Sequence, residues 1–155
     1  MPELHLGSLT ITSPAFSHGG PIPDKHTCNG EDVSPELNWS GVPEGTAELV
    51  LICHDPDAPL TDGFTHWVVY GIPPDATGIP EGGGAQYKQG TTDFGAQQYN
   101  GPAPPPGHGQ HHYYFHLYAL REPLDAEPGL RREEILRRID PLITVQARIV
   151  GTYER

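Results

Sequence analysis

Residues 49–59 read LVLICHDPDAP, an apolar run followed directly by an acidic turn that contains two prolines. Positions 49–53 have the length and apolar density of a buried β-strand. Asp55 and Asp57 follow it, where the restricted φ angles of the prolines hold the backbone in a defined geometry. Taken alone, the pattern is more typical of a plain acidic turn than of a site, because Asp and Pro are ordinary turn residues.

Four other segments have strand character. Residues 67–72 and 113–120 are dense in β-branched and aromatic side chains, so they predict central strands with mostly buried side chains. Residues 8–16 and 36–39 predict two shorter strands.

The rest of the chain divides into loops and a late helix. Residues 75–110 show little periodicity, which is typical of functional loops in a compact domain. Residues 130–139 predict a helix, with glutamates four positions before arginines. Residues 142–153 fit either a short helix followed by a strand or one long strand. Because strands come first and no βαβ alternation follows, we expect a mainly β fold with an antiparallel or mixed sheet and a peripheral helix.

Composition agrees with a single β-rich domain over residues 1–155. The 19 glycines and 18 prolines are spread between apolar runs, which indicates many turns. A formal net charge of −11 disfavours binding to nucleic acid or to anionic lipid. Neither a secretory signal nor an apolar membrane span is apparent, so we expect a cytoplasmic protein in which Cys28 and Cys53 are free thiols.

Further polar residues stand at strand edges. His66 precedes an apolar run, although a lone histidine is more often a hydrogen-bonded core residue. The loop 99–110 delivers His111 and Tyr113 onto a strand, where residues two apart share a face, and Gly101 would allow the backbone to approach a bound group. The prolines at 102–106 could alternatively form a polyproline ligand, but their position before a strong strand favours a pocket wall.

An ordered set of motifs, read together, is much more specific than any one of them. The motifs are Asp55-Pro56-Asp57-Ala58-Pro59, His66-Trp67, Thr92-Asp93-Phe94-Gly95, Tyr99-Asn100-Gly101-Pro102 and His111-His112-Tyr113. In this order they closely resemble the phosphatidylethanolamine-binding protein family, and best its bacterial, Raf kinase inhibitor-like branch. The resemblance runs from about residue 9 to residue 153.

The resemblance implies a β-sandwich of two antiparallel or mixed sheets with a few short peripheral helices. It also implies a small anion pocket that accepts phosphate-like groups, including the phosphoethanolamine head group. The matching positions in this chain are Asp55, Asp57, His66, Gly101, Pro102, His111 and Tyr113. The family commonly has Arg where this chain has His112, which should face away from the pocket and alter either a surface salt bridge or a partner face. Because the bacterial branch is often dimeric, a homodimer is also expected.

The expected function is therefore binding of a small anionic or zwitterionic phosphorylated ligand. With both aspartates ionised and both histidines neutral, the four pocket groups sum to −2, so we expect anion binding to depend on histidine protonation. A zwitterionic head group could also place its amine on the carboxylates.

Three other functions compete with this one. A hydrolase could use the Asp/His cluster as general acid and base, but no G-x-S-x-G motif or cysteine accompanies it, so no enzyme activity is expected. A metal site at Asp55, Asp57, His66 and His111 lacks the usual ligand spacing, and no cofactor is expected. An inhibitor of a kinase or protease would act through contact with a protein partner that the sequence does not identify.

The density of proline in the pocket loops predicts at least one cis X-Pro bond there, first at Ala58-Pro59.

Overall fold

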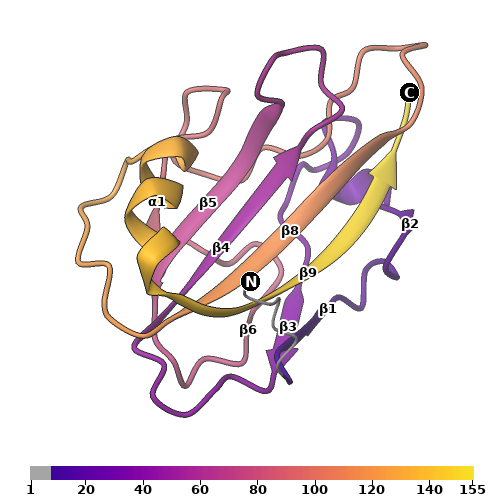
Figure 1. Ribbon diagram of the computed structural model, residues 1–155. Coiled ribbons are helices and arrows are strands. Elements are labelled where there is room, and N and C mark those ends of the chain that lie inside the picture. Colours follow the sequence, from indigo (N-terminus) through magenta and orange to yellow (C-terminus); the bar gives the residue numbers. More distant parts are fainter. Residues whose placement is uncertain (1–7) are drawn as a thin grey trace.

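The largest element is a six-stranded sheet, seen in a computed structural model that describes residues 8–155. Its strands, in chain order, are β2 (Gly20–Pro21), β4 (Glu48–Asp55), β5 (Phe64–Ile72), β7 (Lys88–Gln89), β8 (His111–Leu120) and β9 (Ile143–Tyr153). Their spatial order is β2-β9-β8-β4-β5-β7, and the four long strands lie side by side (Figure 1). Only β2 and β9 pair in parallel, so the sheet is mixed.

A second, smaller sheet closes the core. It consists of β1 (Thr10–Thr12), β3 (Leu37–Ser40) and β6 (Gly78–Ile79), in the antiparallel order β1-β3-β6. One α-helix, α1 (Arg132–Ile139), lies on the opposite side of the large sheet (Figure 1), and two 3-10 turns, η1 (Asp24–His26) and η2 (Asp140–Leu142), complete the described elements. The expected two-sheet, mainly β fold with short helices is confirmed.

Strand β4 is buried along its whole length because both of its faces are covered. Leu51 belongs to the core between the two sheets, together with Trp39 of the small sheet. Ile52, its neighbour, packs on the other face against Ile135 of α1. This double burial explains why the sequence of the strand is continuously apolar instead of alternating.

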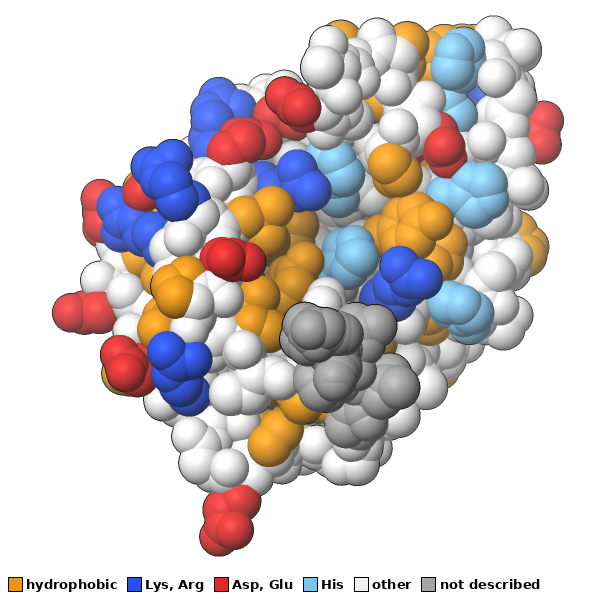
Figure 2. All heavy atoms as spheres, viewed as in Figure 1, with side chains coloured by type: hydrophobic (Ala, Val, Ile, Leu, Met, Phe, Trp, Pro, Cys, Tyr) orange, Lys and Arg blue, Asp and Glu red, His pale blue; other side chains and the backbone are white. Residues whose placement is uncertain are grey.

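Strand β8 alternates, because α1 covers only part of the outer face of the sheet. Tyr113 and Phe115 point into the core and are fully buried. Tyr114 and His116 point outward and are half-buried, with their rings stacked 5.7 Å apart. Figure 2 shows this face, where hydrophobic and histidine side chains reach the surface beside α1.

The three expected central strands are confirmed, with each strand extended by one or more residues. Residues 142–153 form one long strand, β9, preceded by η2, and α1 begins at Arg132, two residues later than expected. The expected cis proline is wrong, because the described chain contains no cis peptide bond. None of its helices is long and apolar enough to cross a membrane.

Candidate functional site

A cavity of about 260 Å³ opens at one edge of the large sheet. It is lined by Asp55, Ala58, Pro59, Leu60, Phe64, His66, Phe94, Ala103, Pro104, Pro105, His111 and Tyr113. The polar members come from the last residue of β4 and the first residues of β5 and β8. Both β5 and β8 are antiparallel to β4, so their N-terminal ends meet its C-terminal end at this edge.

An irregularity in strand pairing brings His66 to the cavity. On β5, Trp67 pairs with Cys53 and Thr65 pairs with His54, which leaves His66 as an extra residue between the two pairs. Strict alternation from Val68, whose side chain packs under α1, would have pointed His66 to that same outer face. A β-bulge re-aims side chains in this way, and here it puts His66 on the inner side, 5.2 Å from the ring of Tyr113.

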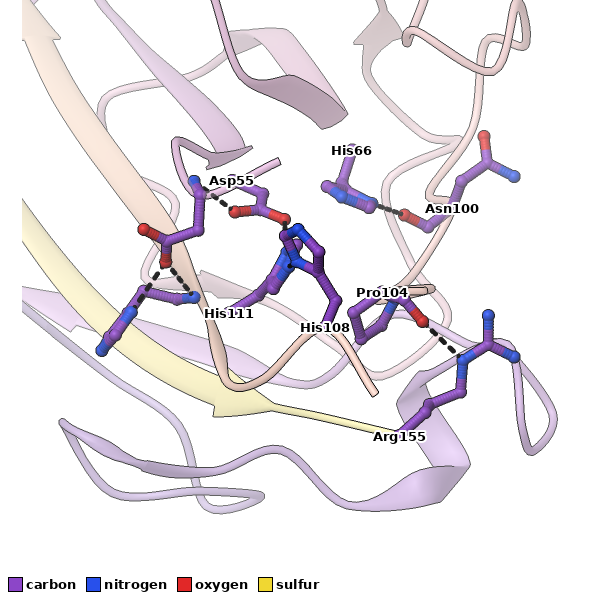
Figure 3. Close-up of polar contacts among 9 residues, drawn as sticks. Asp55, His66, Asn100, Pro104, His108, His111 and Arg155 are labelled. Atoms are coloured by element: carbon purple, nitrogen blue, oxygen red, sulfur yellow. Dashed lines mark hydrogen bonds and ion pairs between the residues drawn. The ribbon is translucent and has the colours of Figure 1, made fainter. Parts of the chain in front are cut away.

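The centre of the site is a buried pair of Asp55 and His111. His111 Nδ1 lies 2.6 Å from Asp55 Oδ2, and both side chains are almost completely buried. The other carboxylate oxygen of Asp55 accepts a 2.7 Å hydrogen bond from the backbone N–H of Asp57 (Figure 3). Because a carboxylate accepts from Nδ1–H, Asp55 fixes the orientation of the ring of His111.

A hydrogen bond to the backbone fixes the tautomer of His66. Its Nδ1 lies 2.7 Å from the carbonyl oxygen of Asn100, so the ring donates from Nδ1 (Figure 3). Burial lowers the pKa of His66, and the hydrogen bond to Asn100 and the charge of Asp55 only partly offset this effect. The ring is therefore neutral near pH 7, with Nε2 as a hydrogen-bond acceptor.

Asp57 does not join the cavity, which corrects the expectation that four acidic and histidine side chains converge there. Its Oδ2 accepts bonds of 2.7 Å from both the backbone N–H and Nδ1 of His112. Burial alone would raise the pKa of Asp57, but these bonds and the charge of His112 outweigh it and lower the pKa. Asp57 thus fastens the turn after β4 to the start of β8, and His112 makes the surface contact expected of it.

Gly101 and Pro102 also lie outside the cavity lining. The backbone N–H of Gly101 donates to Asp32 Oδ1 at 2.8 Å, and the carbonyl of Pro102 accepts from Cys28 N–H at 3.1 Å. A Cβ atom added to Gly101 would lie 2.2 Å from the carbonyl oxygen of His26. Gly101 therefore does allow a close approach, but to another segment of its own chain and not to a ligand.

Substituting Gly101 tests this packing role. We expect Gly101→Ala to lower the free energy of unfolding by about 2–3 kcal/mol, because the added methyl group meets backbone atoms that cannot move aside. Urea denaturation measures the change. Gly107→Ala is the matched control: its Cβ would meet nothing within 4 Å, so only its left-handed φ of 77° is strained, at a cost of about 1–2 kcal/mol. An equal or smaller loss for Gly101→Ala would contradict this account.

The charges of the lining side chains are unusual for an anion site. None of the lining residues, all within the described chain, is Lys or Arg. Arg155 is not a lining residue, and its Nε–H donates a 2.7 Å hydrogen bond to the carbonyl of Pro104, which is one (Figure 3). With Asp57 outside, Asp55 is the one ionised group of the lining when the histidines are neutral. Burial raises the pKa of Tyr113, as does the charge of Asp55, so Tyr113 keeps its proton.

Leu60 and His108 belong to none of the sequence motifs, whereas Phe94 is part of the Thr92-Asp93-Phe94-Gly95 motif. Leu60 and Phe94 stand at the mouth of the cavity with 56% and 47% of their surface exposed, and they are the exposed large hydrophobic side chains of the described chain. His108, on the loop before β8, places Nδ1 2.6 Å from Nε2 of His111. An isolated leucine and a histidine between two glycines have no periodicity, so only the fold shows the positions of Leu60 and His108.

Comparison with known proteins agrees with this architecture. A family model described as phosphatidylethanolamine-binding protein matches residues 12–154. A UPF0098 protein of Aquifex aeolicus is 44% identical over 155 residues, covering 95% of this chain and 89% of the relative.

Two crystal structures are closely similar over almost their whole length. A phosphatidylethanolamine-binding protein homologue of Chlamydia trachomatis has a TM-score of 0.90 at 40% identity, with 97% of this chain and 99% of that chain covered. YbcL of Escherichia coli has a TM-score of 0.89 at 31% identity, with 96% and 99% covered. The chain therefore belongs to the phosphatidylethanolamine-binding protein family.

Proposed function

We propose that the cavity binds a small ligand through a phosphate-type group, and that the hydroxyl of Tyr113 is the donor to it. The observation that carries this proposal is the state of that hydroxyl. Tyr113 is fully buried and lines the cavity, yet its oxygen has no hydrogen-bond partner in the described structure. An unsatisfied buried polar group costs about 1–3 kcal/mol, and a ligand oxygen beside it would recover that energy.

The fixed tautomers of the two histidines limit the form in which a phosphate can bind. Since His66 and His111 both donate from Nδ1, each neutral ring offers Nε2 only as an acceptor. A fully ionised phosphate has only acceptors, so it would face lone pairs and the charge of Asp55. Binding therefore requires one more proton, either on the ligand or on His111.

The remainder of the lining favours a ligand with an organic part. Eight of the twelve lining residues are Ala, Pro, Leu or Phe, and they can contact a carbon substituent better than a bare ion. A zwitterionic head group such as phosphoethanolamine suits this arrangement, because its ammonium could bond an acceptor that a phosphate oxygen cannot use. The neutral Nε2 atoms and the Asp55 carboxylate are such acceptors.

Binding, and not catalysis, is the proposed role. The lining, which falls wholly within residues 8–155, contains no Ser, Thr or Cys that could act as a nucleophile. Cys53 is in the core, where burial raises the pKa of its thiol, and it is not activated. Both cysteines are unpaired, which supports a proposed location in the reducing cytoplasm.

Contact with a partner protein is a second candidate function. The exposed side chains of Leu60 and Phe94 favour it, because apolar groups at the mouth of a cavity are typical of an interaction surface. An inhibitor of a kinase or protease, or a homodimer, would use such a surface. This function does not require the cavity to hold a small molecule.

The pH dependence of binding tests the first candidate. We expect the affinity for O-phosphorylethanolamine, measured by calorimetry, to fall as the pH rises from about 5 to 8, and protons to be taken up on binding. Sulfate is the control ligand, because it does not titrate in this range and so reports protonation of the protein alone. Flat affinity for both ligands would refute the proton requirement, and failure of both to bind at every pH would refute the proposed function.

A further inference from the structure

One side chain of the loop before β8 contacts the buried Asp55–His111 pair. His108 is exposed to solvent, but its Nδ1 lies 2.6 Å from Nε2 of His111, and the two ring centroids are 4.8 Å apart (Figure 3). Asp55, His111 and His108 thus form one hydrogen-bonded chain that leads from the end of β4 to the surface.

This contact occupies the ring nitrogen of His111 that a ligand would need. Nδ1–H of His111 donates to Asp55, so the neutral ring accepts at Nε2 from Nδ1–H of His108. If His111 is protonated, the second bond reverses its direction but persists. In either state a ligand can reach Nε2 of His111 only by replacing His108.

The surroundings of His108 permit that replacement. The flanking residues Gly107 and Gly109 have φ angles of 77° and 98°, and a Cβ on either would meet nothing within 4 Å. Bonds that do not involve the imidazole ring hold the backbone of the loop. Gly107 N–H donates to the carbonyl of Arg155 at 3.0 Å, and His108 N–H donates to the carbonyl of Pro105 at 3.1 Å. Rotation of the exposed ring about its own χ angles therefore suffices to free His111.

We propose that His108 is an internal, displaceable ligand of His111 that competes with the molecule bound in the cavity. It makes the site selective, because a neutral imidazole already satisfies Nε2 and an incoming group must bond His111 better than this imidazole does. A charged group meets that condition, either as an ammonium that donates to the neutral ring or as a phosphate oxygen that accepts from the protonated ring, since charged hydrogen bonds are about twice as strong as neutral ones. Uncharged alcohols and amides do not bond His111 better than the imidazole of His108 does. The selectivity for a phosphate-type ligand rests on the proposed function, but the competition itself does not.

His108→Ala tests the competition, with Gln110→Ala as the matched control, an exposed residue of the same loop. We expect His108→Ala to bind O-phosphorylethanolamine about two- to tenfold more tightly than the unaltered protein, as removal of one competing hydrogen bond should do, and Gln110→Ala to bind as the unaltered protein does. Equal or weaker binding by His108→Ala would overturn the proposal, since His108 would then be either irrelevant or part of the ligand site.

Free imidazole gives a second readout that does not depend on the ligand. In His108→Ala it should occupy the place of the deleted ring at millimolar concentration and shift the ring resonances of His111 in NMR spectra, whereas in the unaltered protein and in Gln110→Ala it should not. If imidazole binds only to His108→Ala while no variant binds O-phosphorylethanolamine, the internal ligand is supported and the proposed function is refuted. If imidazole leaves the His111 resonances of all three proteins unchanged, the internal ligand is refuted.

Discussion

The free energy of unfolding is expected to fall by about 2–3 kcal/mol when the pH is lowered from about 7.5 to about 4.5. His54 and His116 are the cause. Burial lowers the pKa of each to about 4, with help from Arg132 at His54 and from Arg148 at His116. In the unfolded chain both rings titrate near 6.5.

The sign of the effect follows from which state binds more protons. Between about pH 6.5 and pH 4 the unfolded chain binds protons that the folded chain does not bind. The contribution of the two histidines to the free energy of unfolding is therefore fully present above that range and is lost as the pH falls through it. A shift of this size would be worth ~3 kcal/mol for each fully buried ring. Both rings keep some contact with solvent, so we expect a smaller sum for the pair.

His116 offers the clearest variant for this test. Its Nδ1 is buried without a hydrogen-bond partner in the described structure. His116→Gln therefore removes a titrating ring without breaking a hydrogen bond at this nitrogen. Urea denaturation at both pH values should show about half of the original pH effect in His116→Gln and the whole effect in Gln146→Ala, an exposed position on the same face. A free energy of unfolding that is independent of pH in the unaltered protein would contradict the account.

Tyr113→Phe is expected to make the protein more stable and its binding weaker. The hydroxyl of Tyr113 is buried without a partner, so its removal should raise the free energy of unfolding of the ligand-free protein by about 1 kcal/mol. The same change deletes the proposed donor to the phosphate group, and the affinity for O-phosphorylethanolamine should fall about tenfold to a hundredfold, as for a hydrogen bond to a charged group.

Tyr99→Phe is the control for this pair of opposite effects. The hydroxyl of Tyr99 is also buried, but it donates a 2.7 Å hydrogen bond to the carbonyl of His26. Its removal should therefore destabilise the protein by about 1 kcal/mol, without a direct effect on the ligand. Loss of stability in Tyr113→Phe as large as in Tyr99→Phe would show that the hydroxyl of Tyr113 has a structural partner after all.

The sequence predicted the parts of the fold that depend on apolar density. Strands β4, β5 and β8 were evident because their residues are buried in the centre of a sheet, where few other sequences fit. Strand β9 was ambiguous because its first half alternates between half-buried and exposed residues, and its apolar content alone does not distinguish a helix from a strand.

The site was predicted in part, and the errors have local causes. Asp55, His111 and Tyr113 are on regular strand positions, so strand geometry and the family resemblance were sufficient to place them. Asp57 would share the face of Asp55 if β4 continued, but the strand ends at Asp55 and the turn points Asp57 to His112. His66 did reach the cavity, through a bulge that no pattern of hydrophobicity reveals.

A crystal structure of the protein with O-phosphorylethanolamine, grown at about pH 5.5, below the second pKa of a phosphate monoester near 6, would show whether Tyr113 donates to the phosphate. We expect the phosphate to lie in the cavity with one oxygen at hydrogen-bond distance from the hydroxyl of Tyr113, and the ring of His108 to have turned away from His111. A cavity filled only by water at saturating ligand, or a ligand bound outside the lining residues, would contradict this expectation.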